Sequence, residues 1–326
     1  MYNYKQWIRA AALGLLLSCG TGAIFGCSSG IPLVSEVKET EGYTDPQTML
    51  IVATERNRYR KIYTDQIWQV QVRDDGTTFQ TYLAEEIQNF LRELKTTNLL
   101  ADEQNLTLTA QEKEQLHQLA ATFYQSLTEG DLQNIGASED DVYTMYEAYH
   151  RANRLVDELT KDVNLEISDS EARVIVVQEI RVSDAARAQE AYQQVTAEGA
   201  DFAAIARAVS EDSTIEKSVG RSERPKTYEE PVFALAIGEI SPVVEENGTW
   251  YIVKCINDYD EEATLERKQK LALQRKNQAF RQIYNEFAAE HPVKIRGSIW
   301  DDLSFSDGAE STTTDFFELY QEAMNS

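Results

Sequence analysis

A cluster of hydroxyl and carboxylate side chains follows a short apolar helix in the stretch AEGADFAAIARAVSEDST, residues 197–214. The predicted helix has one apolar face at the spacing i, i+3, i+4, i+7, formed by Phe202, Ile205, Ala206 and Val209. The residues from Ser210 to Ser213 then end this helix with a polar corner, whose side chains can donate and accept hydrogen bonds. The corner is therefore either one wall of a catalytic site or only a helix end.

Beyond this corner, the sequence contains none of the common motifs that define a reaction. A glycine-rich phosphate loop, a His-Glu-x-x-His helix, a Cys-x-x-Cys pair and a nucleophile elbow are all absent from it. Two acidic stretches, SEDD at 138–141 and DYDEE at 258–262, lack the ligand and glycine spacing of a calcium loop. We therefore expect no metal and no cofactor, and we interpret both stretches as solvated acidic surface.

The composition indicates a folded protein that does not bind nucleic acid. Its 326 residues are enough for two domains, at about 150 residues per domain. Hydrophobic residues make up 42% of the chain, which supports real cores. The net charge of -24 opposes phosphate binding, which needs clustered lysine and arginine. A basic or neutral polypeptide is a partner that this charge would attract more easily.

The first residues have the layout of a bacterial secretion signal. Lys5 and Arg9 precede an apolar run over residues 10–25, and polar sequence begins directly after Cys27. This layout resembles a lipoprotein signal, in which a cysteine becomes the lipidated first residue. Cys27 is the favoured attachment site and Cys19 is the alternative. An uncleaved anchor helix is disfavoured, because the run is broken by glycine and is shorter than the ~20 residues that a membrane span usually needs.

Cys255 is the one remaining cysteine of the chain. If one N-terminal cysteine is lipidated and the other removed, Cys255 has no partner for an internal disulfide. It ends the apolar run WYIVKC, so we expect a thiol packed in a strand and not a nucleophile.

Helical periodicity dominates the sequence up to Asn164. Three apolar stripes repeat at helical spacing: Leu83, Ile87, Phe90, Leu91 and Leu94; Leu116, Leu119, Ala120, Phe123 and Leu127; Val142, Met145, Tyr146, Tyr149 and Leu155. Three capping boxes also appear: Thr109 with Glu112, Ser138 with Asp141, and Ser168 with Glu171. They predict that helices begin near residues 110, 139 and 169.

Residues 173–256 change to a mixed pattern of strands and helices. The β-branched run VIVVQEIRV is followed by two helical patterns, a loop, and two strand-like runs joined at Asn247-Gly248. Helical periodicity returns over 265–289, and VKIRGSIW then has the composition of a strand. The sequence ends in a Ser/Thr/Asp-rich linker and a short terminal helix.

The mixed region resembles the parvulin-type peptidyl-prolyl isomerase domain. The family pattern has a Gly-x-x-Phe-x-x-x-Ala helix, a Ser-rich corner, a Phe-x-Leu-x-x-Gly-x-Ile-Ser segment and a last strand. GADFAAIARAVSEDS and FALAIGEISPVVEENGTWYIVKC follow it, with matching positions at Phe202, Ser210, Phe233, Leu235, Gly238, Glu239, Ile240 and Ser241.

The whole layout is similar to the PrsA-type foldase lipoproteins and, more distantly, to the SurA-type periplasmic chaperones. This resemblance implies an α+β protein in which a mostly helical chaperone domain is split by a small parvulin-like α+β insert. The expected parts are a lipoprotein-type signal peptide at 1–26, a tether at 27–46, a helical N-terminal chaperone part at 47–171, the parvulin-like domain at 172–257, a C-terminal helix and strand completing the chaperone domain at 258–300, and an acidic, polar tail at 301–326.

The sequence departs from the parvulin pattern at the catalytic positions. Parvulins often carry two histidines on adjacent strands and a cysteine or aspartate in the Ser-rich corner, whereas His117, His150 and His291 all lie outside the matching segment. The alignment places Glu179 and Tyr251 at the histidine positions.

Asp212 occupies the corner position, so the resemblance implies that Asp212, Glu179 and Tyr251 are the catalytic residues. The tyrosine could donate a hydrogen bond to either carboxylate, and two close carboxylates would keep one of them protonated. The alternative is that Glu179 faces solvent, Asp212 caps a turn and Tyr251 fills the core.

The resemblance also assigns the proline pocket. Phe233 is retained, Tyr228 stands where the family has phenylalanine, and Arg224 stands where methionine is usual. Tyr228, Phe233 and Arg224 are therefore the expected substrate-binding residues. A charged side chain at the mouth of the pocket would weaken capture of proline.

Three functions remain open at this point. The first is a foldase, lipid-anchored on the extracytoplasmic face of the bacterial membrane, that binds unfolded or nascent secreted polypeptides and accelerates prolyl isomerisation. The second keeps the chaperone and uses the parvulin-like domain only to bind extended peptide, which the missing histidines favour. The third is an envelope interaction lipoprotein without clients. A homodimer is compatible with each of them.

Overall fold

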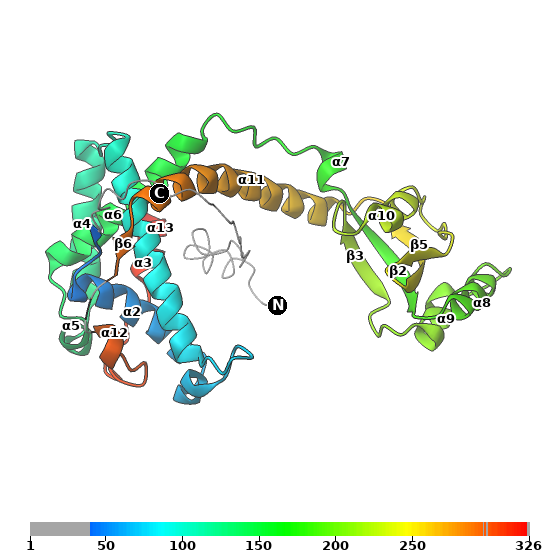
Figure 1. The fold of residues 1–326 in the computed structure, drawn as a ribbon, viewed down its shortest axis with the longest axis horizontal. Coiled ribbons are helices and arrows are strands. Elements are labelled where there is room, and N and C mark those ends of the chain that lie inside the picture. Colours follow the sequence, from blue (N-terminus) through cyan, green and yellow to red (C-terminus); the bar gives the residue numbers. More distant parts are fainter. Residues whose placement is uncertain (1–39, 296, 298, 325–326) are drawn as a thin grey trace, which may run out of the picture. The chain divides into compact units, whose positions relative to one another are not determined.

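The computed structural model describes residues 40–295, 297 and 299–324 (Figure 1). The predicted signal peptide, Cys19, Cys27 and most of the predicted tether lie outside the described residues. The chain forms two compact units, one made of residues up to Asp162 together with those from Ala279 onward, and the other of Val163–Gln278. Among the described residues, none of the helices combines the length and the hydropathy needed to cross a membrane.

The first unit is helical. Its helices are α2 (Asp45–Arg60), the 3-10 helix η1 (Asp65–Gln69), α3 (Phe79–Glu103), α4 (Ala110–Ser126), α5 (Glu129–Ile135), α6 (Glu139–Thr160), α12 (Ile299–Asp302) and α13 (Phe316–Met324). Helix α6 packs against both α3 and α4 (Figure 1). Every residue of the three predicted apolar stripes is buried there, so the stripes do form the core.

The capping signals mark the helix starts correctly. Thr109 and Ser138 form complete capping boxes at the starts of α4 and α6, and Ser168 accepts a hydrogen bond from the amide of Glu171. These contacts satisfy amides in the first helical turn that have no partner within the helix.

Two short strands join distant parts of the first unit. Strand β1 (Thr40–Glu41) pairs in parallel with β6 (Val293–Lys294). Thr40 lies within the range that was predicted as a tether, and helix α2 also begins inside that range. The strand predicted from VKIRGSIW is correct only at its start, because Ile299 and Trp300 belong to helix α12.

The C-terminal segment is part of the core, which corrects the prediction of a polar tail. Phe305, Phe316, Phe317 and Tyr320 are all buried in the same hydrophobic cluster as the stripes of α3, α4 and α6. The aromatic rings of Phe316 and Tyr146 stack with their centroids 4.2 Å apart. The terminal helix predicted from the sequence is therefore present, but it is a structural element of the helical unit.

The second unit contains an antiparallel four-stranded sheet with the order β3-β2-β5-β4. Its elements are α7 (Asp169–Ala172), β2 (Val174–Val182), α8 (Ala185–Val195), α9 (Phe202–Val209), β3 (Glu216–Gly220), α10 (Lys226–Phe233), β4 (Val244–Glu246) and β5 (Thr249–Asn257). The segment predicted as a loop between α9 and β4 thus contains a strand and a helix. Helix α11 (Glu261–Glu290) follows, and the division between the two units falls within it.

The sheet separates two apolar clusters. One face packs against α8 and α9, and the other packs against residues of α10, including Tyr228 and Phe233. The β4–β5 turn has Asn247 and Gly248 at φ 53° and 77°, as the predicted hairpin requires. An α+β chain with a mostly helical part and a small sheet unit confirms the predicted fold class.

Candidate active site

Glu179 is a carboxylate buried on the face of the sheet that packs against α10. It lies within β2, pairs with Val253 of β5, and has only 1% of its surface exposed. A carboxylate at such a position needs hydrogen-bond donors and a nearby cation to compensate for lost water. Glu179 does not face solvent, so that part of the alternative interpretation is wrong.

Lys217 supplies the cation. Its Nζ lies 2.6 Å from Oε1 of Glu179 and 2.7 Å from Oδ2 of Asp212. Strand β3 places it there, because Lys217 pairs with Val177, which lies on the same face of β2 as Glu179. The two carboxylates are therefore bridged by one ammonium group.

Asp212 has the corner position that the sequence indicated. Its Oδ1 accepts a hydrogen bond of 2.9 Å from the Thr214 amide, so it also caps a turn. Ser210 ties the corner to β2 by accepting a hydrogen bond from the amide of Arg181. The bond from Lys217 and the bond from Thr214 hold the pKa of Asp212 below its usual value.

The bridge also changes the pKa of Lys217. Burial alone would lower it, but the hydrogen bonds to Asp212 and Glu179 and their negative charges raise it above the usual lysine value. A charged Lys217 next to a charged Asp212 is thus the stable state of the site around neutral pH.

Tyr228 provides the phenol of the site. Its hydroxyl donates a 2.6 Å hydrogen bond to Oε2 of Glu179, and its side chain is completely buried. Burial, followed by the charge of Glu179, raises the pKa of Tyr228, so the hydroxyl stays protonated as a donor. The sequence had assigned the carboxylate-binding hydroxyl to Tyr251. Among the described residues it is Tyr228 that donates to Glu179. The ring of Tyr251 packs edge-on against Tyr228, with centroids 5.6 Å apart.

Arg224 covers this aromatic pair. Its guanidinium carbon lies 4.2 Å from the ring centroid of Tyr228 and 4.7 Å from that of Tyr251. Nε of Arg224 donates to Glu246 over 3.2 Å, and its Nη1 lies 4.0 Å from Glu179. Arg224 therefore stacks on the rings where the parvulin pattern has an apolar side chain.

Phe233, the third expected pocket residue, is buried at the end of α10. The guanidinium of Arg221 lies 4.5 Å from its ring centroid, and that of Arg173 lies 5.8 Å away. Arginine side chains therefore lie close to the aromatic rings of both Tyr228 and Phe233.

The structure brings Glu179, Asp212, Tyr228, Tyr251 and Arg224 together and adds Lys217, which the sequence did not single out. Lys217 was missed because EKSVG was not recognised as a strand. Once this stretch is known to be β3, the alternation of side chains between the two faces of the sheet places Lys217 on the same face as Glu179. Cys255 is buried in β5, and burial raises the pKa of its thiol, in keeping with the predicted packed residue.

Comparison with known proteins defines the class of this unit. Residues 176–257 match the family described as "Rotamase: PPIC-type PPIASE domain". The chain thus contains a PPIC-type rotamase domain, as its resemblance to parvulins implied. The matched residues lie in the second unit, Val163–Gln278, which is therefore the rotamase unit.

Beyond that domain, the chain is similar to a protein named "Foldase protein PrsA" from Caldanaerobacter subterraneus subsp. tengcongensis. The two are 26% identical over 254 residues, which cover 71% of this chain and 76% of the relative. The expected resemblance to PrsA-type foldases is confirmed.

Solved structures of similar proteins cover most of the chain. Foldase protein PrsA from Streptococcus pneumoniae has 18% identity and a TM-score of 0.30, and covers 71% of this chain and 97% of its own. Peptidylprolyl isomerase PrsA from Bacillus cereus has 17% identity and a TM-score of 0.39, and covers 78% and 99%.

Proposed function

We propose that this protein is an extracytoplasmic, membrane-anchored foldase whose rotamase unit accelerates cis-trans isomerisation of X-Pro bonds in secreted polypeptides. The observation that carries the proposal is the network in which Lys217 bridges Glu179 and Asp212 while Tyr228 donates to Glu179. All four side chains lie within residues 176–257, the range that matches the PPIC-type domain, and Glu179 and Asp212 are among the residues that the parvulin pattern assigns to the catalytic site.

Prolyl isomerisation needs polar side chains held in fixed positions and no covalent step. Rotation of the X-Pro bond removes the resonance of the amide, against a barrier of about 18–20 kcal/mol. A catalyst lowers that barrier by binding the twisted amide more tightly than the planar one, with polar groups already held in place.

The side chains divide into those that can reach a substrate and those that hold them. Asp212 and Lys217 keep 29% and 24% of their side-chain surface exposed, so they can contact a bound amide. Glu179 and Tyr228 are buried, and they fix the position and charge of Lys217. We assign the direct contacts to Asp212 and Lys217, and a positioning role to Glu179 and Tyr228.

The helical unit and the N-terminal sequence support the rest of the proposal. A relative with 26% identity over most of the chain is named a foldase, which suggests unfolded polypeptides as substrates. The signal-like N-terminus, with Cys27 or Cys19 as the acylated residue, suggests a lipid anchor on the outer face of the membrane.

The test is a prolyl isomerisation assay on short X-Pro peptides with the chain from Ser28 onward, which keeps every described residue. We expect acceleration that Asp212→Ala and Lys217→Met both reduce strongly. Lys270→Met, which removes an exposed lysine from helix α11, is the matched control and should keep full activity.

The second candidate function is a chaperone whose rotamase unit only binds extended peptide. It is favoured by the position of Arg224, because proline cannot stack on the rings of Tyr228 and Tyr251 while the guanidinium covers them. Suppression of aggregation of an unfolded client without any isomerase activity would select this function over the first.

A further inference from the structure

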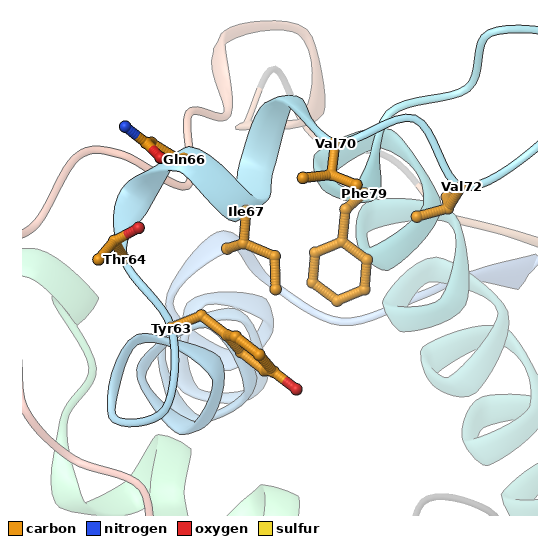
Figure 2. Close-up of a pocket in the computed structure, with 7 residues that line it drawn as sticks. All are labelled: Tyr63, Thr64, Gln66, Ile67, Val70, Val72 and Phe79. Atoms are coloured by element: carbon orange, nitrogen blue, oxygen red, sulfur yellow. The ribbon is translucent and has the colours of Figure 1, made fainter.

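An apolar pocket lies on the surface of the helical unit. It has a volume of about 440 Å³ and is lined by Tyr63, Thr64, Gln66, Ile67, Val70, Val72 and Phe79 (Figure 2). This volume falls within the range of ligand-binding pockets in general, roughly 300–1,000 Å³. Apolar side chains from the loop after α2, from η1, from the following segment and from the start of α3 face one another around it.

The floor of the pocket is held in place by aromatic packing. The ring of Phe79 meets that of Tyr59 edge-on at 4.9 Å and stacks near Trp68 at 5.9 Å between centroids. Trp68 is fully buried and also packs against Phe305, at 5.2 Å. The pocket is thus preformed on the main core of the unit, so a ligand would not have to order it first.

The rim of the pocket is exposed and apolar. Tyr63, Val70 and Val72 keep 53%, 51% and 43% of their surface exposed, and the neighbouring Ile62 keeps 74%. Scattered exposed apolar residues are ordinary, but three of these four line one preformed pocket and the fourth, Ile62, is adjacent in sequence to a lining residue. Such a grouping of exposed apolar side chains is typical of an interaction site.

A free main-chain edge runs beside the pocket. Residues 70–79 form a small hairpin in which the amide of Val72 donates to Thr77 and the amide of Phe79 donates to Val70. These bonds flank the bridge between Gln71 and Thr78, so the amide and carbonyl of Gln71 point to the opposite edge. Within the described part of the chain, neither group makes a hydrogen bond.

Together these features fit an extended polypeptide. A strand laid along this edge can pair its main chain with Gln71 and place an apolar side chain into the pocket, which is how edge-binding modules recognise peptides. Asp74 and Asp75 lie exposed in the turn of the same hairpin, and the chain carries a net charge of -24. The edge therefore favours a basic partner over an acidic one.

We propose that this pocket and the Gln71 edge bind extended segments of unfolded polypeptide in which apolar and basic side chains alternate. The inference rests on the proposed function in one respect, namely that unfolded polypeptides are the partners of this protein. It goes further by giving the helical unit a binding site that does not require a proline in the bound segment.

The test uses a short fluorescein-labelled, proline-free peptide in which leucine and lysine alternate, with binding followed by fluorescence anisotropy on the chain from Ser28 onward. Val72→Lys places a positive charge on the rim without touching the buried core, so it removes an apolar contact and repels the lysines of the peptide, and should weaken binding by about tenfold or more. An N-methylated version of the peptide, which cannot donate main-chain hydrogen bonds to the carbonyl of Gln71, should also bind more weakly. Ile237→Lys makes the same kind of change at an exposed apolar residue of the rotamase unit, and this variant should bind the peptide like the unchanged protein.

Equal binding by the Val72→Lys and Ile237→Lys variants would overturn the proposal. So would a protein that never binds the peptide but loses self-association on Val72→Lys substitution, because the occupant would then be a second copy. The isomerase assay is run in parallel on the same samples. Peptide binding without isomerase activity would contradict the proposed isomerase function and support the proposed binding site. Isomerase activity without peptide binding would support the isomerase function and contradict the binding site.

Discussion

The ammonium of Lys217 lies 2.6 Å from a carboxylate oxygen of Glu179, whose side chain is buried within the sheet. This ion pair, extended to Asp212, gives the rotamase unit a polar network without histidine. A buried carboxylate is stable only while its partners remain, because a buried unpaired charge is costly. The same contact is therefore both a stability determinant and the centre of the proposed active site.

Removal of Lys217 should expose this dependence. Lys217→Met is expected to lower the free energy of unfolding by about 2 kcal/mol, because Glu179 loses its nearer cation and keeps only the hydrogen bond from Tyr228 and the guanidinium of Arg224 at 4.0 Å. The double variant Glu179→Gln/Lys217→Met should recover part of that loss, since no unpaired charge remains buried. Urea denaturation of the single and double variants measures both effects, and strictly additive losses would show that the two side chains do not interact.

The two tyrosines of the site should behave differently. Tyr228→Phe removes a hydroxyl that donates to Glu179 and is expected to cost about 1–2 kcal/mol of stability and to reduce isomerase activity. Tyr251→Phe is the matched control, because among the described residues its hydroxyl has no hydrogen-bond partner and its ring contact with Tyr228 is kept. Similar effects of both substitutions on activity would argue against a specific role for the Tyr228 hydroxyl.

Arg224 should limit access of proline to the aromatic rings. Arg224→Met removes the guanidinium that lies over Tyr228 and Tyr251 and supplies the side chain usual in parvulins, so kcat/KM on X-Pro peptides is expected to rise several-fold. Lys226→Met removes a positive charge from an exposed position at the start of α10 and serves as the control. A lower kcat/KM for Arg224→Met would instead show that the arginine contacts the substrate.

The pH dependence should lack the inflection that histidine gives near pH 6.5. The pKa of Asp212 is lowered by Lys217 and Thr214, so its stabilising contribution is present above the unfolded value of about 3.9 and is lost as pH falls through the lower folded value. The pKa of Lys217 is raised, so its contribution is complete below about 10.4 and is lost only at higher pH. Isomerase activity should thus be constant between about pH 5 and pH 9, and a step near neutrality would contradict this network.

Local signals in the sequence predicted much of the helical unit. Thr109, Ser138 and Ser168 each begin a helix at the expected residue, because a capping side chain satisfies amides only a few positions away. The hairpin at Asn247-Gly248 is just as local, since it depends on two residues that accept positive φ.

The segment EKSVGRSERPKTYEEP was harder to predict, because its strand and helix are specified by distant partners. Strand β3 is defined by its pairing with β2, and helix α10 contains Pro231, which usually argues against a helix. The position of Lys217 depends on β3, so the central cation of the site could not be found from spacing alone. The family alignment indicated Glu179 and Asp212, but it could not show which tyrosine reaches the carboxylate.

The polar segment before helix α13 shows how a buried acid can fold a stretch that has the composition of a tail. Asp131 of helix α5 is almost completely buried and accepts hydrogen bonds from the amides of Thr312 and Thr313, at 2.6 and 3.0 Å, and from the hydroxyl of Ser311 at 3.0 Å. These bonds hold the segment that leads into Phe316, whose ring lies in the core of the helical unit.

Asp131→Ala should therefore destabilise the helical unit much more than the removal of an exposed acid would. It leaves the amides of Thr312 and Thr313 without their acceptor, and we expect a loss of about 3 kcal/mol in the free energy of unfolding. Asp301→Asn, which neutralises an exposed acid on α12, is the control and should change stability by less than about 0.5 kcal/mol. Hydrogen exchange of the Thr312 and Thr313 amides gives a direct readout, because both should exchange faster in Asp131→Ala while the amides of strand β2 keep their protection. Unchanged exchange at these two amides would mean that aromatic packing alone holds the C-terminal segment in place.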